Sequence, residues 1–341
     1  MNNPGSMMKK INSGAMIMKK ILLTLGAMLL ATVAFGTHTV HADDTWTPVA
    51  TLGTSLTSDQ KSGTLSTLEN AANVSNVSEL TVNGDTLVKY LNPSGSTFTS
   101  TSGVWSSALV QKTSTGGINV TIVPYNGTNN ITTITSDQYR NAAVTAGVSN
   151  ANIFITSAVS IDGSGALAGV YAAFAQNGDT LNASQIAAAQ TEVNTLSDIT
   201  DANKGKDGYT DKQLNNAVAG MKKDMATQSN SGEQTLSQNT IGNIVDSQLK
   251  ANNLTNIINN NQRTQIINLM VKIQNSGALK SSDFKAQASK LASSIQSSAK
   301  NLFSKLKGLD TQENRNLLQK ILDAIGNFFA SLWDKITGLL N

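Results

Sequence analysis

The sequence predicts an N-terminal domain of layered sheet and helices, either α+β or α/β, followed by a C-terminal all-helical domain. Three observations predict it. Short strand patterns alternate with helical ones up to about residue 180. Beyond residue 182, apolar residues recur at helical spacing. The charge balance also reverses, because 43–180 holds nine acidic and four basic side chains whereas 181–341 holds 13 acidic and 17 basic ones. We therefore expect two domains, 43–180 and 181–341.

Residues 1–42 have the features of a secretory signal peptide and are left out of the fold prediction. A pair of lysines precedes the apolar run 21–35, which is too short to span a bilayer stably. A small-residue cleavage pattern then ends at Ala42, so we expect cleavage before Asp43. Residues 1–17 are consistent with an overextended start. An uncleaved N-terminal anchor is the alternative, and the main prediction is a secreted protein, free or loosely associated with the cell wall.

Cleavage would remove both histidines, and the chain contains no cysteine at all. The mature protein then has no Ser-His-Asp triad, no His-bearing zinc site, no thiol nucleophile and no disulfide. We accordingly expect no cofactor, and the sequence identifies no small-molecule substrate. A carboxylate-dependent glycan hydrolase is the enzymatic alternative, because it needs only two acids across a cleft. Asp85, Asp137 and Asp162 are its candidates, although a turn accounts for Asp85 and a helix cap for Asp137.

Strands in the N-terminal domain are predicted where apolar and polar residues alternate. Turn residues and helix caps separate them: Thr57 or Ser58 begins one helix, and Gly147 ends another by adopting a left-handed conformation. The predicted strands are 79–82, 118–123 and 151–161, and the predicted helices include 138–146, which is capped from within 135–137, and 166–174.

Two groups of polar residues in this domain are candidate ligand contacts. Tyr139, Arg140 and Asn141 could recognise a polar ligand, because Arg140 is one of only four basic residues in its domain. The alternative is an arginine that pairs with a nearby acid on its own helix. Asp162 and Ser164 begin a helix whose backbone N–H groups could hold an anion, and a simple capping turn is the competing interpretation.

Five ordered motifs lie between residues 50 and 180. They are LGTSLTSDQ at 52–60, GINV at 117–120, ITTIT at 131–135, YRNAAVTAG at 139–147 and GALAG at 165–169. Together they resemble a secreted Gram-positive family catalogued as domain of unknown function 1002, and the likeness extends more loosely to about residue 306. The resemblance implies a secreted, envelope-associated protein, and it supplies no catalytic residues.

The second domain is predicted to consist of helices joined by polar segments. Helices are expected at 187–196, 211–225, 241–249 and 265–273. A polar connection is expected at 198–209. A flexible segment is expected near 226–240, where nine of the 15 residues are Ser, Gln, Asn or Gly.

Two amphipathic stretches end the chain. One apolar stripe runs from Phe284 to Leu306, and a second runs from Leu317 to Leu340. The stripes either pack as an antiparallel helical bundle or as a lid on the N-terminal domain, or the terminal one docks on a membrane surface or a partner with Trp333 at the interface. The first stretch is strongly basic, and its candidate polyanion-binding residues are Lys280, Lys285, Lys290, Lys300, Lys305 and Lys307.

These features predict a secreted, cell-envelope-associated, non-enzymatic binding or scaffolding protein. Its basic helices are expected to contact anionic wall polymer or a surface protein. The basic stretch has too few interleaved aromatic residues for specific nucleic-acid recognition. Besides the hydrolase, the alternative is a protein that acts on membrane surfaces through its terminal amphipathic helix.

Overall fold

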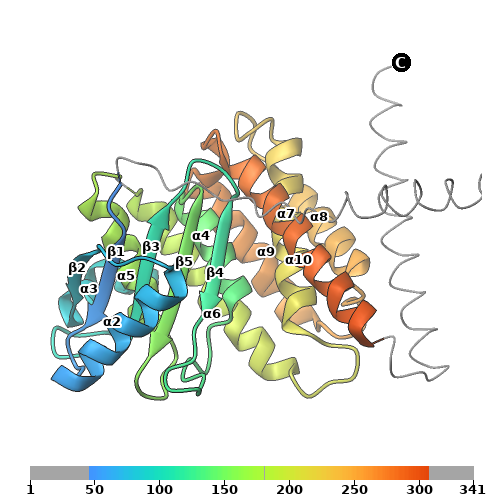
Figure 1. Cartoon of the computed structure of the whole chain (residues 1–341). Helices are drawn as coiled ribbons and strands as arrows, with labels where there is room; N and C mark the ends of the chain where they lie inside the picture. The colour runs from blue at the N-terminus through green and yellow to red at the C-terminus, as the bar shows by residue number, and fades with distance from the viewer. Residues whose placement is uncertain (1–45, 180, 307–341) are drawn as a thin grey trace, which may run out of the picture. The chain divides into compact units, whose positions relative to one another are not determined.

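The computed structural model describes residues 46–179 and 181–306 (Figure 1). Side chains are described up to residue 298. The predicted cleavage site between Ala42 and Asp43, Lys307 and the terminal stripe 317–340 lie outside the described residues. Within those residues, no helix is both long and apolar enough to cross a membrane.

A five-stranded mixed sheet forms the N-terminal part. Its strand order is β2-β1-β3-β5-β4. The two outer pairs, β1 with β2 and β4 with β5, are parallel, whereas β3 runs antiparallel to both of its neighbours. The strands are β1 (Val49–Gly53), β2 (Ser78–Val82), β3 (Ser106–Lys112), β4 (Ile118–Ile122) and β5 (Ala151–Ser157).

The sequence predicted β2, β4 and β5 but not β1 and β3. All five residues of β1 are buried, as are the first five of β3, because helices cover both faces of the sheet there. Such strands show no alternation of apolar and polar residues. The prediction also ran too far in β5, which ends at Ser157; beyond it, Ile161 forms only an isolated bridge with Ile131.

Helices lie on both faces of the sheet. In the view of Figure 1, α2 (Ser58–Ala72) crosses in front, while α4 (Ser136–Ala146) and α5 (Ser164–Gln176) lie behind. The α2 face buries a small cluster of Leu52, Leu68 and Leu109. The opposite face belongs to the main core, which α3 (Gly84–Leu91) also joins. The fold is therefore α+β, with a helical C-terminal part.

Two glycines let α5 lie unusually close to the sheet. A Cβ atom on Gly169 would lie 2.3 Å from the Thr51 hydroxyl oxygen, and one on Gly165 would lie 2.9 Å from the Ser106 hydroxyl oxygen. Real Cβ atoms do not approach other atoms so closely, so a larger residue would push the helix outward. Close contact fixes the start of α5, which carries Asp162 and Ser164.

The helix signals read from the sequence are largely confirmed. Thr57 is the N-cap of α2 and forms a reciprocal capping box with Gln60, in which each side chain accepts a hydrogen bond from the other residue's backbone N–H. Thr135 and Gln138 do the same for α4. Gly147 ends α4 with φ of 87°, in the left-handed region that glycine adopts without strain.

The C-terminal part is helical, as predicted, with somewhat different bounds. The predicted connection 198–209 is wrong over its first turns, because α6 continues to Asn203 and buries Ile199. The non-helical residues within the predicted flexible segment 226–240 are 229–237, between α7 and α8. The Gln274 side chain both donates a hydrogen bond to the backbone of Leu236 and accepts one from it. The helices are α6 (Ala183–Asn203), α7 (Asp211–Gln228), α8 (Gln238–Ala251), α9 (Asn260–Asn275) and α10 (Phe284–Leu306), with a short 3₁₀ turn η2 (Ala278–Lys280) before α10.

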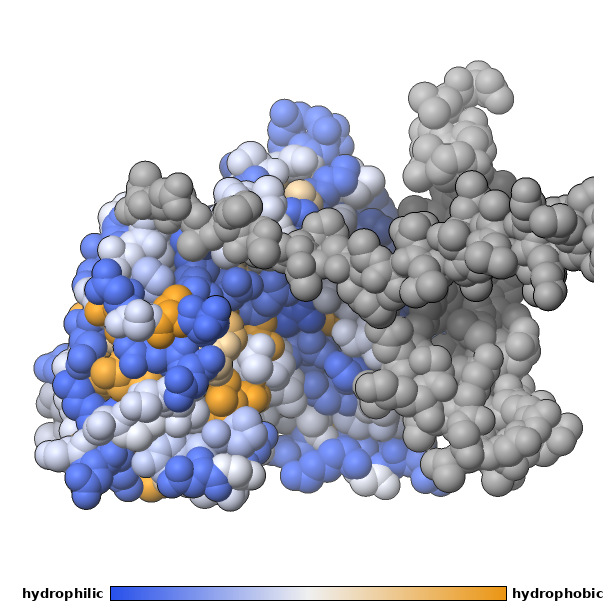
Figure 2. All heavy atoms as spheres, viewed as in Figure 1, coloured by the Kyte–Doolittle hydropathy of each residue, from blue (hydrophilic) through white to orange (hydrophobic). Residues whose placement is uncertain are grey.

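The helical part packs directly onto the sheet part. Helix α4 contacts α6, α7 and α10, and buried residues of both parts belong to one hydrophobic cluster. In Figure 2 the visible hydrophobic residues gather mainly over α2 and the neighbouring strands, whereas the described helical region is mostly hydrophilic on this side.

Candidate functional site

The three candidate ligand contacts of α4 are all buried structural groups. Tyr139 donates a 2.8 Å hydrogen bond from its hydroxyl to the backbone carbonyl of Gly163, and burial raises the pKa of this phenol well above its usual value. The Asn141 amide donates to the carbonyl and the side-chain oxygen of Asn215 on α7. Both side chains are buried and join neighbouring elements, and the buried Asn141 side-chain oxygen has no hydrogen-bond partner among the described residues.

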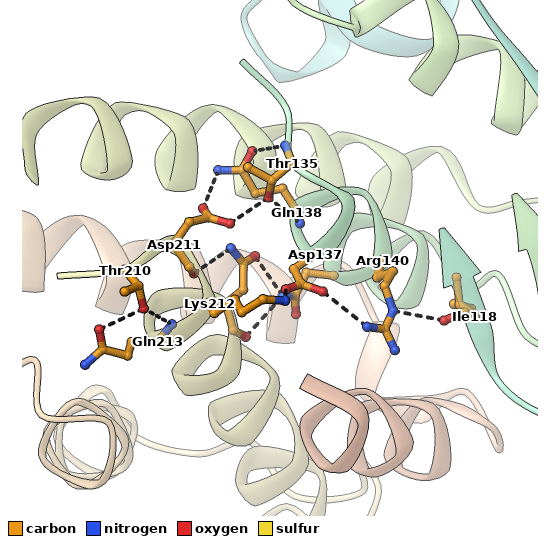
Figure 3. Close-up of polar contacts among 11 residues, drawn as sticks. Ile118, Thr135, Asp137, Gln138, Arg140, Thr210, Asp211, Lys212 and Gln213 are labelled. Carbon is orange, nitrogen blue, oxygen red and sulfur yellow. Dashed lines mark hydrogen bonds and ion pairs between the residues drawn. The ribbon is translucent and has the colours of Figure 1, made fainter. Parts of the chain in front are cut away.

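Arg140 pairs with an acid, as the alternative interpretation held. Its guanidinium donates to Asp137 at 3.2 Å and to the carbonyl of Ile118 at 3.0 Å, which places the arginine between α4 and the start of β4 (Figure 3). Lys212 of α7 reaches the second oxygen of the same carboxylate at 3.3 Å. Asp137 is therefore a shared ion-pair partner; the cap of α4 is Thr135.

Asp211 is a second polar centre, which the sequence analysis did not single out. Its carboxylate accepts a 2.7 Å hydrogen bond from the Thr135 hydroxyl and a longer one from Gln138 (Figure 3). It also accepts a 3.1 Å hydrogen bond from the Thr200 hydroxyl. Burial raises the pKa of Asp211 from its usual value, and the hydrogen bonds oppose that rise. It thereby links the cap of α4 to the first turn of α7.

A fully buried ion pair lies deeper in the same contact. The Lys222 ammonium of α7 donates to Glu192 of α6 at 2.8 Å, and neither side chain has any exposed surface. The ammonium also donates to the backbone carbonyl of Asn141 and to the Thr145 hydroxyl, which itself donates to Glu192. Burial lowers the pKa of Lys222, whereas the nearby carboxylate acts to raise it.

A signal for this pair was present in the sequence. Glu192 lies four residues from both Ala188 and Leu196, and Lys222 lies four residues after Val218, so each charge occupies the apolar stripe of its helix. A charge in such a position indicates a buried partner, because burying an unpaired charge is prohibitively costly. Periodicity alone does not identify which partner it meets.

Asp162 and Ser164, by contrast, line a cavity of about 330 Å³. The Asp162 carboxylate accepts hydrogen bonds from the backbone N–H and the hydroxyl of Ser164, the first residue of α5, at 3.0 and 2.7 Å. The N-cap position itself is Gly163. Among the candidate acids of the hydrolase hypothesis, Asp137 is held in ion pairs and Asp85 is exposed in the first turn of α3. Asp162 therefore stands apart from the other two by its place in a cavity wall.

The lysines predicted to bind polyanion lie on the outer helices. Lys280 is exposed at the end of η2, and Lys285 and Lys290 are exposed on α10. The side chains of Lys300 and Lys305 are not among those described. Within the described part of the chain, none of the three exposed lysines forms an ion pair; Lys290 approaches only Asn150, at 3.5 Å.

Metal chemistry receives no support from the acidic residues. Among the residues that the structure describes, no group of three or more Asp, Glu, His or Cys side chains is placed to hold an ion. A second, smaller cavity of about 200 Å³ has Lys112 and Asp179 in its wall. These two already form an ion pair at 2.6 Å, so they satisfy each other.

Comparison with known proteins finds a relative and a family. The chain is 25% identical over 342 aligned residues to the Uncharacterized protein YpuA of Bacillus subtilis (strain 168), and the alignment covers 97% of this chain and 99% of that protein. No solved structure matches the chain. A family model described as protein of unknown function (DUF1002) matches residues 52–291, which is most of the chain, and the protein therefore belongs to that family.

Proposed function

We propose that this protein is secreted and associated with the cell envelope, where it acts without catalysis as a binding or scaffolding module. In this proposal Lys280, Lys285 and Lys290, which we call the lysine surface, contact anionic wall polymer. The observation that carries the proposal is their exposure without an ion-pair partner among the described residues.

The packing of α10 supports this role. Its apolar side is buried against α7 and α4 through Phe284, Ala288, Leu291 and Ile295. Because each helical residue turns by about 100°, Lys285 and Lys290 project about 140° apart, on the two flanks of the side left exposed. A linear polymer that crosses the helix would contact both of them.

The surface between these flanks has no opposing charge of its own. The sequence of α10 contains no Asp or Glu, and its exposed back carries Ala286, Ser293 and Ser297. The Ser293 hydroxyl can donate a hydrogen bond to a phosphate or carboxylate oxygen, whereas the Ser297 hydroxyl already donates to the Ser293 carbonyl at 2.9 Å. The small alanine leaves room for a polymer chain. The nearest acidic residue in the sequence is Asp283, which directly precedes the helix.

The distribution of charge along the chain determines which side of the protein would face the polymer. The sheet part has a net charge of −5, with nine acidic and four basic residues in 43–180. An anionic polymer is therefore repelled from the sheet part and attracted to the lysine surface. Binding through α10 would hold the acidic part away from the polymer.

The test is binding of the mature protein, starting at Asp43, to isolated Gram-positive cell walls. Replacing Lys280, Lys285 and Lys290 by Gln should weaken binding on the order of 100-fold, if each lysine contributes about 1 kcal/mol as lysines do at anionic membrane surfaces. Binding should also weaken steeply with salt.

The matched control removes three exposed lysines elsewhere, Lys204, Lys206 and Lys250, again by replacement with Gln. It changes the net charge equally and should retain wall binding. If both triple variants lost wall binding equally, net charge alone would explain binding and the lysine surface would have no specific role. Unchanged binding of the lysine-surface variant, or unchanged binding of the parent protein to walls stripped of anionic polymer, would refute the proposal.

A further inference from the structure

We propose that the cavity beside Asp162 is a binding site for a single sugar unit that carries no phosphate or carboxylate group. The site is separate from the lysine surface and does not depend on the function proposed above. Its wall is built from three places: the segment before α4, the start of α5, and the middle of α6. The lining residues are Thr133, Ile134, Asp162, Ser164, Val193, Asn194, Ser197 and Asp198.

The size of the cavity limits what it can hold. A volume of about 330 Å³ corresponds to roughly 11 water molecules at about 30 Å³ each. It lies at the lower end of the range of about 300–1,000 Å³ typical of small-molecule sites. A single sugar ring fits such a space, whereas a folded partner or a long polymer segment does not.

The chemistry of the wall selects the ligand class. Two carboxylates, three hydroxyls and one amide face a ligand, together with the aliphatic side chains of Ile134 and Val193, and no basic residue lines the cavity. The carboxylates accept hydrogen bonds and repel anions. A sugar offers hydroxyl donors on its edges and C–H groups on its faces, which matches a wall that is polar with a small apolar part.

Several of these polar groups remain available for a ligand. Asp198 and Asn194 are exposed on α6, and neither the Asp198 carboxylate nor the Thr133 hydroxyl makes a hydrogen bond within the described residues. The Gln190 amide donates a 2.8 Å hydrogen bond to the side-chain oxygen of Asn194 and so orients the Asn194 amide. The NH₂ group of Asn194 makes no hydrogen bond to the described residues. Acceptors and a donor therefore coexist in one wall.

The wall is held in place by hydrogen bonds, so the site exists before a ligand arrives. The backbone N–H of Ile134 donates to the carbonyl of Asp162 at 3.1 Å, and that of Thr132 donates to the carbonyl of Ile161 at 2.8 Å. On the α6 side, the Ser197 hydroxyl donates to Gln138 at 3.4 Å, within the network that holds α4 to α7. A preformed wall lowers the entropic cost of binding.

The place of the cavity in the sheet agrees with this assignment. The parallel neighbours β4 and β5 lead into α4 and α5, respectively, and the cavity is lined by residues just before or at the start of those helices. Crevices beyond the carboxyl ends of parallel strands are frequent ligand sites in open sheets. In this protein Thr135 caps α4, and the Asp162 carboxylate already accepts from the first backbone N–H of α5, so a negative charge is present at that helix start without a bound anion.

The experiment measures sugar binding to the mature protein by titration calorimetry and by NMR chemical shifts of Thr133, Asn194 and Ser197. The probes are glucose, glucosamine and N-acetylglucosamine, with glucose 6-phosphate as the anionic counterpart of glucose. We expect at least one of the three uncharged or amine-bearing sugars to bind saturably in the millimolar range and to shift those signals. Glucose 6-phosphate should bind at least tenfold more weakly than glucose or not at all.

Two variants on the same helix make the test specific. Asp198→Asn should weaken binding of the sugar at least tenfold, because a carboxylate acceptor of the cavity is lost. Asp201→Asn is the matched control, since Asp201 is exposed three residues further on and pairs with Lys204 outside the cavity. Thermal unfolding of both variants should match the parent protein.

Three outcomes would overturn the proposal: no saturable binding of any of the three sugars, equal affinity in the Asp198 and Asp201 variants, or tighter binding of glucose 6-phosphate than of glucose. None of them bears on the lysine surface, whose triple variant should bind sugar normally. Wall binding and sugar binding can therefore fail independently.

Discussion

Lysine has opposite roles in two regions of this molecule. At the contact of α4, α6 and α7, Lys222 is fully buried and satisfied by Glu192, a hydroxyl and a backbone carbonyl. On the outer side of η2 and α10, Lys280, Lys285 and Lys290 are exposed and have no ion-pair partner among the described residues. The same ammonium group thus holds elements together in one region and is available to a ligand in the other. Burial and pairing, more than residue type, distinguish a charge that holds the fold together from one that is exposed on its surface.

The largest expected effect is the loss of stability when the buried ion pair of Lys222 is broken. Lys222→Met should destabilise the fold by about 3–5 kcal/mol, because it leaves the Glu192 carboxylate buried without a compensating charge. Replacing both partners by apolar residues, as in Lys222→Met with Glu192→Leu, should recover most of that loss. Urea unfolding of the single and double variants measures both changes.

The control for this experiment is an exposed pair of the same type. Lys204→Ala removes the partner of Asp201, and both side chains are more than half exposed. Its effect should stay below about 1 kcal/mol, since exposed ion pairs contribute little. A Lys222 variant that unfolds like the Lys204 variant would show that the buried pair does not stabilise the contact of α4, α6 and α7.

The second effect concerns the cap of α4. Thr135→Ala should cost about 1–2 kcal/mol, because it removes the N-cap of α4 and also a hydrogen bond to the partly buried Asp211. Thr57→Ala on α2 is the matched control, since Thr57 caps its helix in the same way without bonding to an acid. Chemical denaturation should show the larger loss for Thr135, and equal losses would mean that Asp211 gains nothing from this bond.

The third effect is a change in the pH dependence of stability. Burial raises the pKa of Asp211, so the folded state holds its proton more tightly than the unfolded state does. This contribution to stability is complete below the usual value of 3.8 and is lost as pH rises through the folded-state pKa. Asp211→Asn should therefore lose less stability than the parent protein between pH 3.8 and neutrality.

Denaturation curves collected across that pH range provide the measurement. In the Asp211 variant, the free energy of unfolding should fall less steeply with rising pH than in the parent protein. It should still fall, because burial also raises the pKa of Asp224, which the variant retains. A variant slope as steep as that of the parent protein would mean that Asp211 does not carry the proposed proton linkage.

The smallest expected effect sharpens the exposed side of the comparison. Lys285→Gln and Lys290→Gln should each change the free energy of unfolding by no more than about 0.5 kcal/mol, because both side chains are exposed. The same substitutions should weaken wall binding. A large loss of stability in either variant would indicate that these lysines are structural, like Lys222.

Local features of the fold were predictable from the sequence where the signal depends on neighbouring residues. The cap at Thr135, the left-handed end at Gly147 and the strand at 118–123 follow from hydrogen bonds or alternation within a few positions. The strand β3 was not predictable in this way, because its leading residues are all buried and lack a period. The end of α6 was missed for a different reason, since polar residues there are tolerated once Ile199 is buried beneath them.

The candidate sites divide along the same line. Composition and spacing selected Asp162 and the basic residues of η2 and α10, because a helix start and a run of lysines can both be recognised from neighbouring positions in the sequence. They also selected Tyr139, Arg140 and Asn141, which the structure buries as links between elements. Asp198 was not singled out, because nothing in its neighbourhood along the chain marks it as facing Asp162 across a cavity.

By itself, the sequence determined a sheet-and-helix N-terminal part, the helical C-terminal part, the family and the absence of cysteine, since each depends on composition, motifs or short-range periodicity. The choice of α+β over α/β came from the mixed strand directions in the sheet. Only the tertiary structure decided which charges are paired and which are open to a ligand. That distinction depends on which distant segments meet, as α4, α6 and α7 meet around Lys222. Hydrogen bonds and burial between segments far apart in the chain leave no fixed spacing for a sequence pattern to reveal.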